Sequence, residues 1–359
     1  MAEKNFAFES DNVSIAFVLN YGLGDCIIAK KVFEALVELA PDCRIDIFCV
    51  GEQHKVFAKA FYGGERNLNL ITVHGEIYKQ VVKNYDLAIH VGAAFAVFLE
   101  AVNGKRLQTK SPELLQAAIK ISDYNKRNVF CVSPWGTALA SRNIILSKIL
   151  RKNCYEFLSC DRALPIRDDK VNIPLAPEYK SKFKKLKLDS YITIYANIAE
   201  RERDKPKNKA WSLPYLNEYV ALVRKNFPKV AIVQVDGKGS VKIESCDRHY
   251  LTNDLELVKY ILANSLLHVG CEGGLIHLAT ALGTKCVVLF GASSCYYFGY
   301  DRNINVVSEV CSPCMYILPD YSVCLRGLKE PVCMASITPQ HVCDLTCNYL
   351  RQLDFKNNA

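Results

Sequence analysis

Residues 268–291, HVGCEGGLIHLATALGTKCVVLFG, contain two short apolar runs separated by a glycine turn and a helix-length segment. The runs LLHVG (266–270) and KCVVLF (285–290) have the length and the β-branched content of buried strands. GGLIHLATAL (273–282) lies between them and is expected to form a helix. Strands that are joined through a helix run parallel, so this stretch predicts a parallel sheet covered by helices.

The same alternation extends over most of the chain. Further strands are expected at 13–19, 44–50, 68–73, 85–91, 191–196, 230–235 and 304–308, with helices at 25–40, 213–227 and 254–264. Asn253 is expected to be the N-cap of the last of these helices, with Glu256 three residues later. The chain has 359 residues, and its charged run 168–188 has the character of a linker. The expected fold class is therefore α/β, with two doubly wound domains, 1–185 and 186–359.

The composition excludes some classes of protein. Apolar residues make up 50% and charged residues 23%, which is typical of a folded chain and not of a disordered one. The 45 basic and 37 acidic residues leave a net charge of +8, too small an excess for a protein that coats nucleic acid. The basic clusters at 179–188 and 201–209 are expected to be solvated surface, or to meet phosphates or an anionic membrane face.

The N-terminus lacks the features of a secretory signal, and the apolar runs are too short to span a bilayer. A cytoplasmic protein is expected, with peripheral association at the inner membrane as an option. The 16 cysteines are then expected to be thiols or metal ligands rather than disulfides.

The first candidate site is NYGLGDCIIAKK (20–31), directly after the first expected strand. Gly22 and Gly24 allow a tight turn and a close approach to a ligand. Asp25 follows at a helix N-terminus, where it faces the expected cleft; the alternative is a simple N-cap. The third glycine of a dinucleotide fingerprint is absent, because Ile27 occupies its position.

The second candidate site is the glycine turn of 268–291. Gly273 and Gly274 leave N–H groups free at a helix N-terminus, which suits a diphosphate. Glu272 can accept hydrogen bonds from sugar hydroxyls, and His277 follows one turn later on the same side of the helix. The alternative is a core histidine behind an ordinary turn.

The third and fourth candidates lie on either side of this stretch. Lys209, before a helix that Ser212 can cap, can reach a leaving phosphate; a solvated lysine is the alternative.

Four cysteines are spaced C-x2-C-x9-C-x8-C and could bind zinc or iron as thiolates: Cys311, Cys314, Cys324 and Cys333. Cys343 and Cys347, four residues apart on a terminal helix, are expected to serve packing only.

Several of these motifs together resemble glycosyltransferase family 9, the bacterial ADP-heptose heptosyltransferases. The similar segments are GLGD (22–25), NKAWSLPYL (208–216), the block 251–291 and the tail with its four cysteines. The resemblance implies a GT-B fold, in which two Rossmann-like domains face each other. The first is expected to bind the acceptor, and the second, ending in a crossing C-terminal helix, to bind the nucleotide sugar.

The resemblance also implies inverting transfer from ADP-heptose, without a catalytic metal. It makes Asp25 the catalytic base and Lys209 the lysine that contacts phosphate. Gly22, Gly24 and the Glu272-Gly273-Gly274…His277 block then belong to the donor site. The usual Asp-Ser/Thr-Gly of the family reads Glu-Gly-Gly here, and the segment 296–306 and the cysteine spacing are most similar to the subgroup near the autotransporter heptosyltransferases.

Three functions stay open at this stage. The acceptor could be a lipopolysaccharide core or a related glycan, or a Ser/Thr side chain of an autotransporter-like protein. A non-catalytic nucleotide-sugar-binding scaffold is the third option, which the presence of both Asp25 and Lys209 disfavours. No nucleic-acid partner is expected, and a homo-oligomer is compatible with the sequence.

Overall fold

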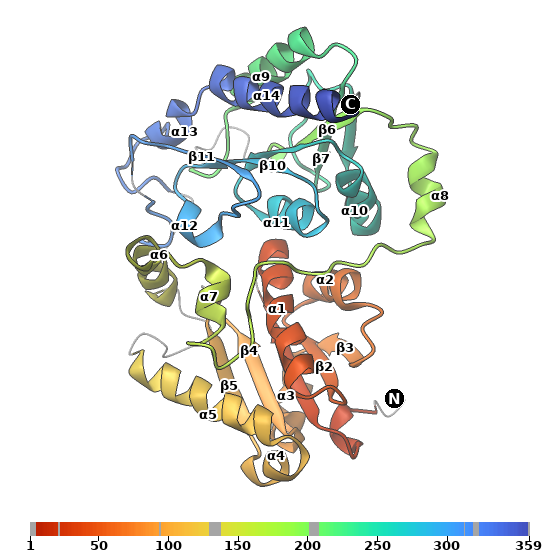
Figure 1. Ribbon diagram of the computed structural model, residues 1–359, viewed down its shortest axis with the longest axis vertical. Coiled ribbons are helices and arrows are strands. Elements are labelled where there is room, and N and C mark those ends of the chain that lie inside the picture. Colours follow the sequence, from red (N-terminus) through yellow and green to blue (C-terminus); the bar gives the residue numbers. More distant parts are fainter. Residues whose placement is uncertain are drawn as a thin grey trace. The chain divides into compact units, whose positions relative to one another are not determined.

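A computed structural model of the chain describes residues 5–20, 22–92, 95–128, 138–200, 208–311, 313–318 and 323–357. The chain divides into two compact units, Met1–Pro174 and Leu175–Ala359 (Figure 1). The division falls within the expected linker, ahead of the predicted boundary at 185/186. Most of the basic cluster 201–209 lies outside the described residues.

The N-terminal unit is built on a five-stranded sheet in the order β3-β2-β1-β4-β5. Its strands are β1 (Ser14–Leu19), β2 (Arg44–Cys49), β3 (Leu68–Val73), β4 (Leu87–Val91) and β5 (Val97–Val102). The first four confirm the expected strands and run parallel. The strand β5 was not expected and runs antiparallel to β4, because a tight hairpin in which Gly92 N donates to Ala96 O joins them.

The helices of this unit are α1 (Leu23–Leu39), α2 (Glu52–Tyr62), α3 (Gly75–Val81), α4 (Gly104–Lys110), α5 (Pro112–Arg127), α6 (Ala138–Leu150) and α7 (Cys154–Leu158), with short 3-10 turns at Ala7–Glu9 and Val82–Asn84. Apolar residues at helical spacing bury one face of α1, including Ile27, Ile28 and Val32. Ser111 begins α5 by accepting a hydrogen bond from Leu114 N, and Pro112 follows at the first helical position.

The C-terminal unit has a six-stranded sheet in the order β11-β10-β9-β6-β7-β8, in which every neighbouring pair is parallel. Its strands are β6 (Tyr191–Ile194), β7 (Ala231–Asp236), β8 (Arg248–Leu251), β9 (His268–Cys271), β10 (Cys286–Phe290) and β11 (Ile304–Val307). The strand β8, which is polar and at an edge, was not expected. This is a doubly wound order, with its switch point between β6 and β9.

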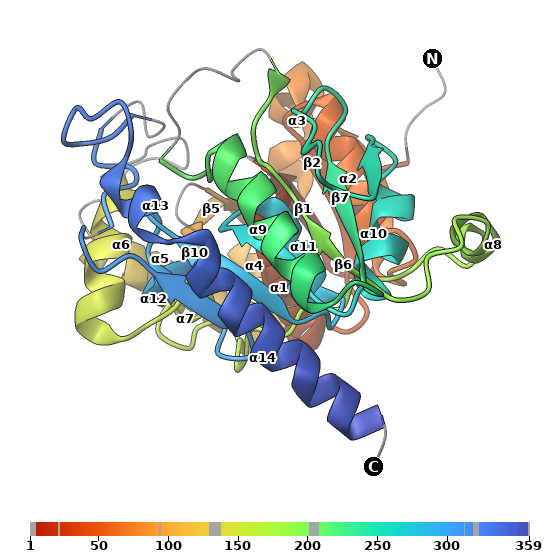
Figure 2. The same cartoon turned by 90° about the horizontal axis from the view of Figure 1, so that it is seen from above.

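The helices of this unit are α8 (Tyr179–Lys184), α9 (Leu213–Asn226), α10 (Leu255–Ala263), α11 (Gly274–Ala281), α12 (Cys295–Phe298), α13 (Val332–Ser336) and α14 (Pro339–Asn357). The last helix, α14, packs along α9 on one face of the sheet, and both views show the two side by side (Figures 1 and 2). Cys343 and Cys347 are buried in this contact, with their sulfurs 3.6 Å apart. The α/β prediction is confirmed in both units.

One helix start differs from its expectation. The N-cap of α10 is Asp254, whose Oδ1 accepts a hydrogen bond from Leu257 N, and not Asn253. Asn253 Oδ1 instead accepts a hydrogen bond from Lys238 N, which ties the turn after β7 to the start of the helix. Either side chain can cap a helix, and the path of the β7–β8 loop decides between them.

Candidate functional site

Asp25 lies in the first turn of α1, directly after β1. The strand order of the N-terminal sheet reverses beside β1, and doubly wound folds bind ligands at the carboxyl ends of the strands there. The N-cap of α1 is Gly22, and Asp25 is the third helical residue, so Asp25 is not the N-cap itself, although its carboxylate takes part in capping the helix. Asp25 Oδ2 accepts a hydrogen bond from Gly22 N at 2.9 Å, which orients the carboxylate at the start of the helix.

Space rather than backbone angle favours glycine at position 22. Its φ of −81° is accessible to any residue. A Cβ added there would lie 3.1 Å from Asp25 Oδ2, which is tighter than an ordinary contact. A tight turn was expected from Gly22 and Gly24, but the backbone at Gly22 is extended. The missing side chain of Gly22 leaves room for the Asp25 carboxylate to contact the Gly22 backbone.

The second group of residues lies at the carboxyl end of β9, beside the switch point of the C-terminal sheet. Glu272 follows β9 directly and is 4% exposed. Lys209 Nζ lies 2.6 Å from Glu272 Oε2, and the Lys209 side chain is 22% exposed. The structure thus brings Lys209 to Glu272 across 63 positions of sequence (272 − 209).

Two more side chains hold the Glu272 carboxylate. Ser293 Oγ donates a hydrogen bond to Glu272 Oε2 at 2.7 Å. His277 Nε2 lies 3.4 Å from Glu272 Oε1, and the other ring nitrogen of His277 pairs with the Tyr300 hydroxyl at 2.7 Å. His277 is buried, so it is a partnered histidine inside the unit that touches the site through Glu272.

The charge on Glu272 is stabilised by these partners. Burial raises the pKa of the Glu272 carboxyl, but the nearby Lys209 ammonium, together with His277, lowers it more, so the pKa lies well below its ordinary value. Glu272 is therefore ionised and paired with Lys209 at neutral pH.

The start of α11 presents unpaired backbone donors next to this pair. The first backbone bonds of the helix run from Ile276 N and His277 N to Gly273 O. In the described part of the chain, the N–H groups of Gly273 and Gly274 have no backbone acceptor, and both residues are partly exposed. Free N–H groups at a helix N-terminus, together with a lysine, form an arrangement that can bind an anion such as a diphosphate.

Tyr195, which the sequence analysis missed, explains two glycines of the quoted stretch. It follows β6, is 4% exposed, and donates its hydroxyl to the Cys271 carbonyl. A Cβ at Gly270 would lie 2.1 Å from Tyr195 Cε1, and one at Gly273 would lie 2.9 Å from the Tyr195 hydroxyl. Gly273 has an extended φ of 167°, so it is needed for the close approach of Tyr195.

Asp236, at the end of β7, was also missed. It is buried, and its Oδ2 accepts hydrogen bonds from Ala196 N at 2.8 Å and from Gln234 Nε2 at 2.9 Å. Burial raises the pKa of the Asp236 carboxyl to about 6, although these hydrogen bonds lower it. Its position directly after the expected strand 230–235 is the sequence signal that could have identified it.

The loop that contains Lys209 is anchored on both sides. Ala292 N donates to Asn208 O at 3.4 Å, and Asn197 Nδ2 donates to Lys209 O at 3.2 Å. Trp211 is buried, and its Nε1 donates to the Ile337 carbonyl at 2.9 Å. Ser212 caps α9, as expected, by accepting a hydrogen bond from Tyr215 N. Lys209 is therefore held in place and is not a freely solvated lysine.

The four cysteines of the tail lie near one another. Burial, together with the proximity of Cys311, Cys314 and Cys324, raises the pKa of the Cys333 thiol to about 11. In the described part of the chain, however, no three His, Cys, Asp or Glu side chains are grouped so that they could hold a metal ion. The thiols fit a thiophilic metal chemically, but they are not arranged as a ligand set.

Comparisons with known proteins agree with this geometry. Residues 252–318, which include β9, α11 and β10, match the model of glycosyltransferase family 9 (heptosyltransferase). No curated protein matches the chain. A glycosyltransferase family 9 protein of Veillonella parvula is 14% identical, with a TM-score of 0.61, and the match covers 94% of this chain and 97% of that one.

Two further solved structures share the fold. ADP-heptose LPS heptosyltransferase II of E. coli is 13% identical, with a TM-score of 0.58 and coverage of 96% and 99%. The dodecameric, iron-containing heptosyltransferase TibC, of enterotoxigenic E. coli, in complex with ADP-D-β-D-heptose, is 15% identical, with a TM-score of 0.58 and coverage of 96% of this chain and 78% of that one. The fold is that of the GT-B glycosyltransferases. The match of residues 252–318 to the glycosyltransferase family 9 model agrees with the resemblance seen in the sequence.

Proposed function

We propose that the protein is an inverting glycosyltransferase that transfers a heptose from ADP-heptose to an acceptor hydroxyl. The observation that carries this proposal is the pair formed by Lys209 and the buried Glu272 carboxylate, beside the free N–H groups of Gly273 and Gly274. The glutamate and both glycines lie in the segment that matches the family model, and Lys209 is held against it. Structural relatives that bind ADP-heptose support the choice of donor.

Lys209 and the α11 N-terminus are proposed to bind the diphosphate of the donor. Negative charge grows on the leaving diphosphate as the bond to the sugar breaks, and fixed donors stabilise it without reorganising. Each such donor typically contributes about 3 to 4 kcal/mol to transition-state stabilisation. Glu272, Ser293 and His277 then keep Lys209 in position, and Glu272 has remaining lone pairs that could accept a hydrogen bond from the sugar.

Asp25 is proposed to be the general base. Its carboxylate would take the proton of the acceptor hydroxyl as that oxygen attacks the anomeric carbon, and the sugar–diphosphate bond breaks on the opposite face. General-base catalysis of this kind typically gives about 10² to 10⁴ in rate. The hydrogen bond from Gly22 N orients this carboxylate at the start of α1.

The acceptor is proposed to be a hydroxyl of a lipopolysaccharide core or a related glycan. The four tail cysteines are proposed to be structural, and no step of the reaction is assigned to a metal. If a metal binds, Cys311, Cys314, Cys324 and Cys333 are the residues that would hold it, as thiolates.

The test is calorimetric titration with a panel of ADP- and UDP-activated sugars, followed by transfer assays. We expect binding to ADP-heptose only, loss of donor binding in Lys209→Ala, and nearly unchanged donor binding with abolished turnover in Asp25→Asn. The exposed Lys225→Ala on α9 is the matched control and should bind as the wild type does.

Each contrary result has a distinct meaning. Binding of another nucleotide sugar alone would contradict the choice of ADP-heptose as donor. Nucleotide-sugar binding without transfer would favour the non-catalytic scaffold over the enzyme, and no binding at all would contradict both. Full turnover by Asp25→Asn would contradict the role of Asp25 as the general base. A mass gain on a co-expressed autotransporter-like protein, without transfer to core glycan, would replace the glycan acceptor by Ser/Thr side chains.

A further inference from the structure

The outer face of α6 in the N-terminal unit is apolar. Ile145, Ile149 and Leu150 are 56%, 69% and 50% exposed, whereas Ile144 and Ser147 are buried against the unit. Ile145 and Ile149 are four residues apart and therefore lie on the same side of the helix. A helix at the surface of a globular unit ordinarily turns polar residues outward, so this row of isoleucines needs a partner.

The same helix end is strongly basic. The sequence KILRK (148–152) places Lys148, Arg151 and Lys152 around the two most C-terminal apolar residues, and no Asp or Glu occurs between 138 and 155. In the described part of the chain, none of these three cations is paired with a carboxylate. Lys31 of the same unit, in contrast, is paired with Asp168 at 2.7 Å.

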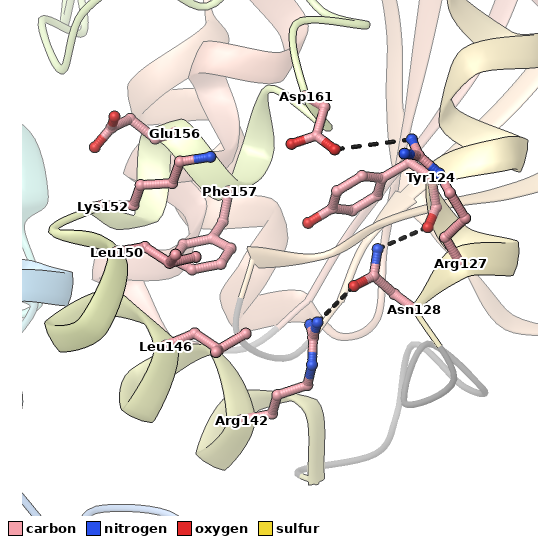
Figure 3. A pocket seen from close by; sticks show the side chains of 10 residues that line it. All are labelled: Tyr124, Arg127, Asn128, Arg142, Leu146, Leu150, Lys152, Glu156, Phe157 and Asp161. Carbon is pink, nitrogen blue, oxygen red and sulfur yellow. Dashed lines mark hydrogen bonds and ion pairs between the residues drawn. The ribbon is translucent and has the colours of Figure 1, made fainter.

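A pocket of about 250 Å³ opens beside this helix (Figure 3). Leu146, Leu150 and Phe157 form its apolar side. Its polar side includes Lys152, Arg127 and Arg142 together with two acidic residues, Glu156 and Asp161, and Glu156 Oε2 accepts a hydrogen bond from Asn153 N. Arg142 donates to Asn128 Oδ1 at 2.7 Å, and Arg127 lies 3.8 Å from Asp161. The pocket thus joins an apolar wall, to which Leu146 and Leu150 of α6 contribute, to a mixed polar side that includes Lys152.

We propose that α6 and the KILRK segment form a docking surface for an anionic lipid membrane. Ile145 and Ile149 would enter the boundary between head groups and acyl chains, as the apolar face of an interfacial helix does. Lys148, Arg151 and Lys152 would lie at the level of anionic lipid head groups, one of which the pocket can receive.

Charge complementarity decides the nature of the partner. A second copy that met this face through the same surface would bring a second set of three unpaired cations against the first, and like charges in contact repel. An anionic bilayer offers acyl chains for the apolar side chains and negatively charged head groups for the cations. The inference is independent of the proposed function, because membrane binding requires no nucleotide sugar.

The test is cosedimentation of the full chain with vesicles of phosphatidylcholine alone or with phosphatidylglycerol. We expect binding to the anionic vesicles that weakens as salt is added. Ile145→Ser with Ile149→Ser should lower the partition coefficient by about tenfold or more. Lys148→Gln, Arg151→Gln and Lys152→Gln should each lower it by about fivefold.

Matched controls lie on the neighbouring helix α5. Ile119→Ser and Lys120→Gln replace an exposed isoleucine and an exposed lysine of the same unit and should bind as the wild type does. Equal binding to both kinds of vesicle, or equal losses in the α5 controls, would overturn the proposal. So would a change from oligomer to monomer in the isoleucine variants, because a second copy would then be the partner. Wild-type binding by Lys152→Gln would overturn the role of the pocket.

Discussion

Lys209 Nζ and Glu272 Oε2 lie 2.6 Å apart, although one residue precedes α9 and the other follows β9. The carboxylate is almost fully buried and the ammonium is partly exposed, so water reaches the pair from the Lys209 side only. This geometry keeps one cation at the edge of the α11 N-terminus, where the proposed diphosphate would bind.

Removing Lys209 should destabilise the unit, because the buried Glu272 carboxylate loses its cation. We expect Lys209→Met to cost about 3 kcal/mol in the free energy of unfolding, measured by urea denaturation. Adding Glu272→Gln should restore much of this loss without restoring sugar transfer. Lys225→Met on α9 serves as the control for a lysine change at the surface. A Lys209→Met variant as stable as the wild type would contradict the pair's structural role.

The pH dependence of stability should show a contribution from Asp236. Its pKa is raised to about 6 in the folded protein, against roughly 4 for an unfolded chain. A raised pKa contributes stability that is fully present below the unfolded pKa and is lost as pH rises through the folded pKa. The wild type should therefore lose stability relative to Asp236→Asn between about pH 4 and 6. Parallel stability curves for the two proteins over this window would contradict the burial argument.

A methyl group at Gly270 should disturb the switch point of the C-terminal sheet. Its Cβ would lie 2.1 Å from Tyr195 Cε1, so the ring or the strand must move. We expect Gly270→Ala to cost about 1 to 3 kcal/mol, as overpacked cores do, measured by thermal unfolding. Gly237→Ala, whose Cβ would meet nothing closer than 4.0 Å, is the control. Tyr195→Leu should relieve part of the cost in the double variant; strictly additive losses would exclude the predicted clash.

Thiol labelling should separate the cysteines into two groups. Burial raises the pKa of Cys43, Cys49, Cys246, Cys271 and Cys286 to about 12, so these thiols should resist alkylation in the native protein. Cys311 and Cys324 are partly exposed and should react first. Peptide mass spectrometry after brief treatment with iodoacetamide at pH 7.5 measures this order, with urea-unfolded protein as the reference. Early labelling of the first group would contradict their burial.

Local periodicity predicted most of the fold. The first four strands of the N-terminal sheet, and five of the six in the C-terminal sheet, were expected, because buried parallel strands are continuous apolar runs. The missed strands are β5 and β8. β8 is polar and lies at an edge, and β5 is interrupted by the charged residue Glu100. The position of Asp254 rather than Asn253 at the start of α10 depended on a loop that no local pattern describes.

The sequence by itself determined two α/β units, the placement of Asp25 and Glu272 directly after strands, and the glycine turn before α11. Only the tertiary structure decided which side chains meet there. Lys209 contacts Glu272, and Tyr195 covers Gly270, because loops distant in the chain converge at the carboxyl ends of the strands. The exposure of the α6 isoleucines could likewise not be predicted from the sequence. Periodicity shows that a helix has apolar residues, but it does not show which face of the helix the rest of the unit covers. The burial and the pairing of side chains depend on packing between segments that are distant in the chain. The sequence pattern describes only the local structure of each segment.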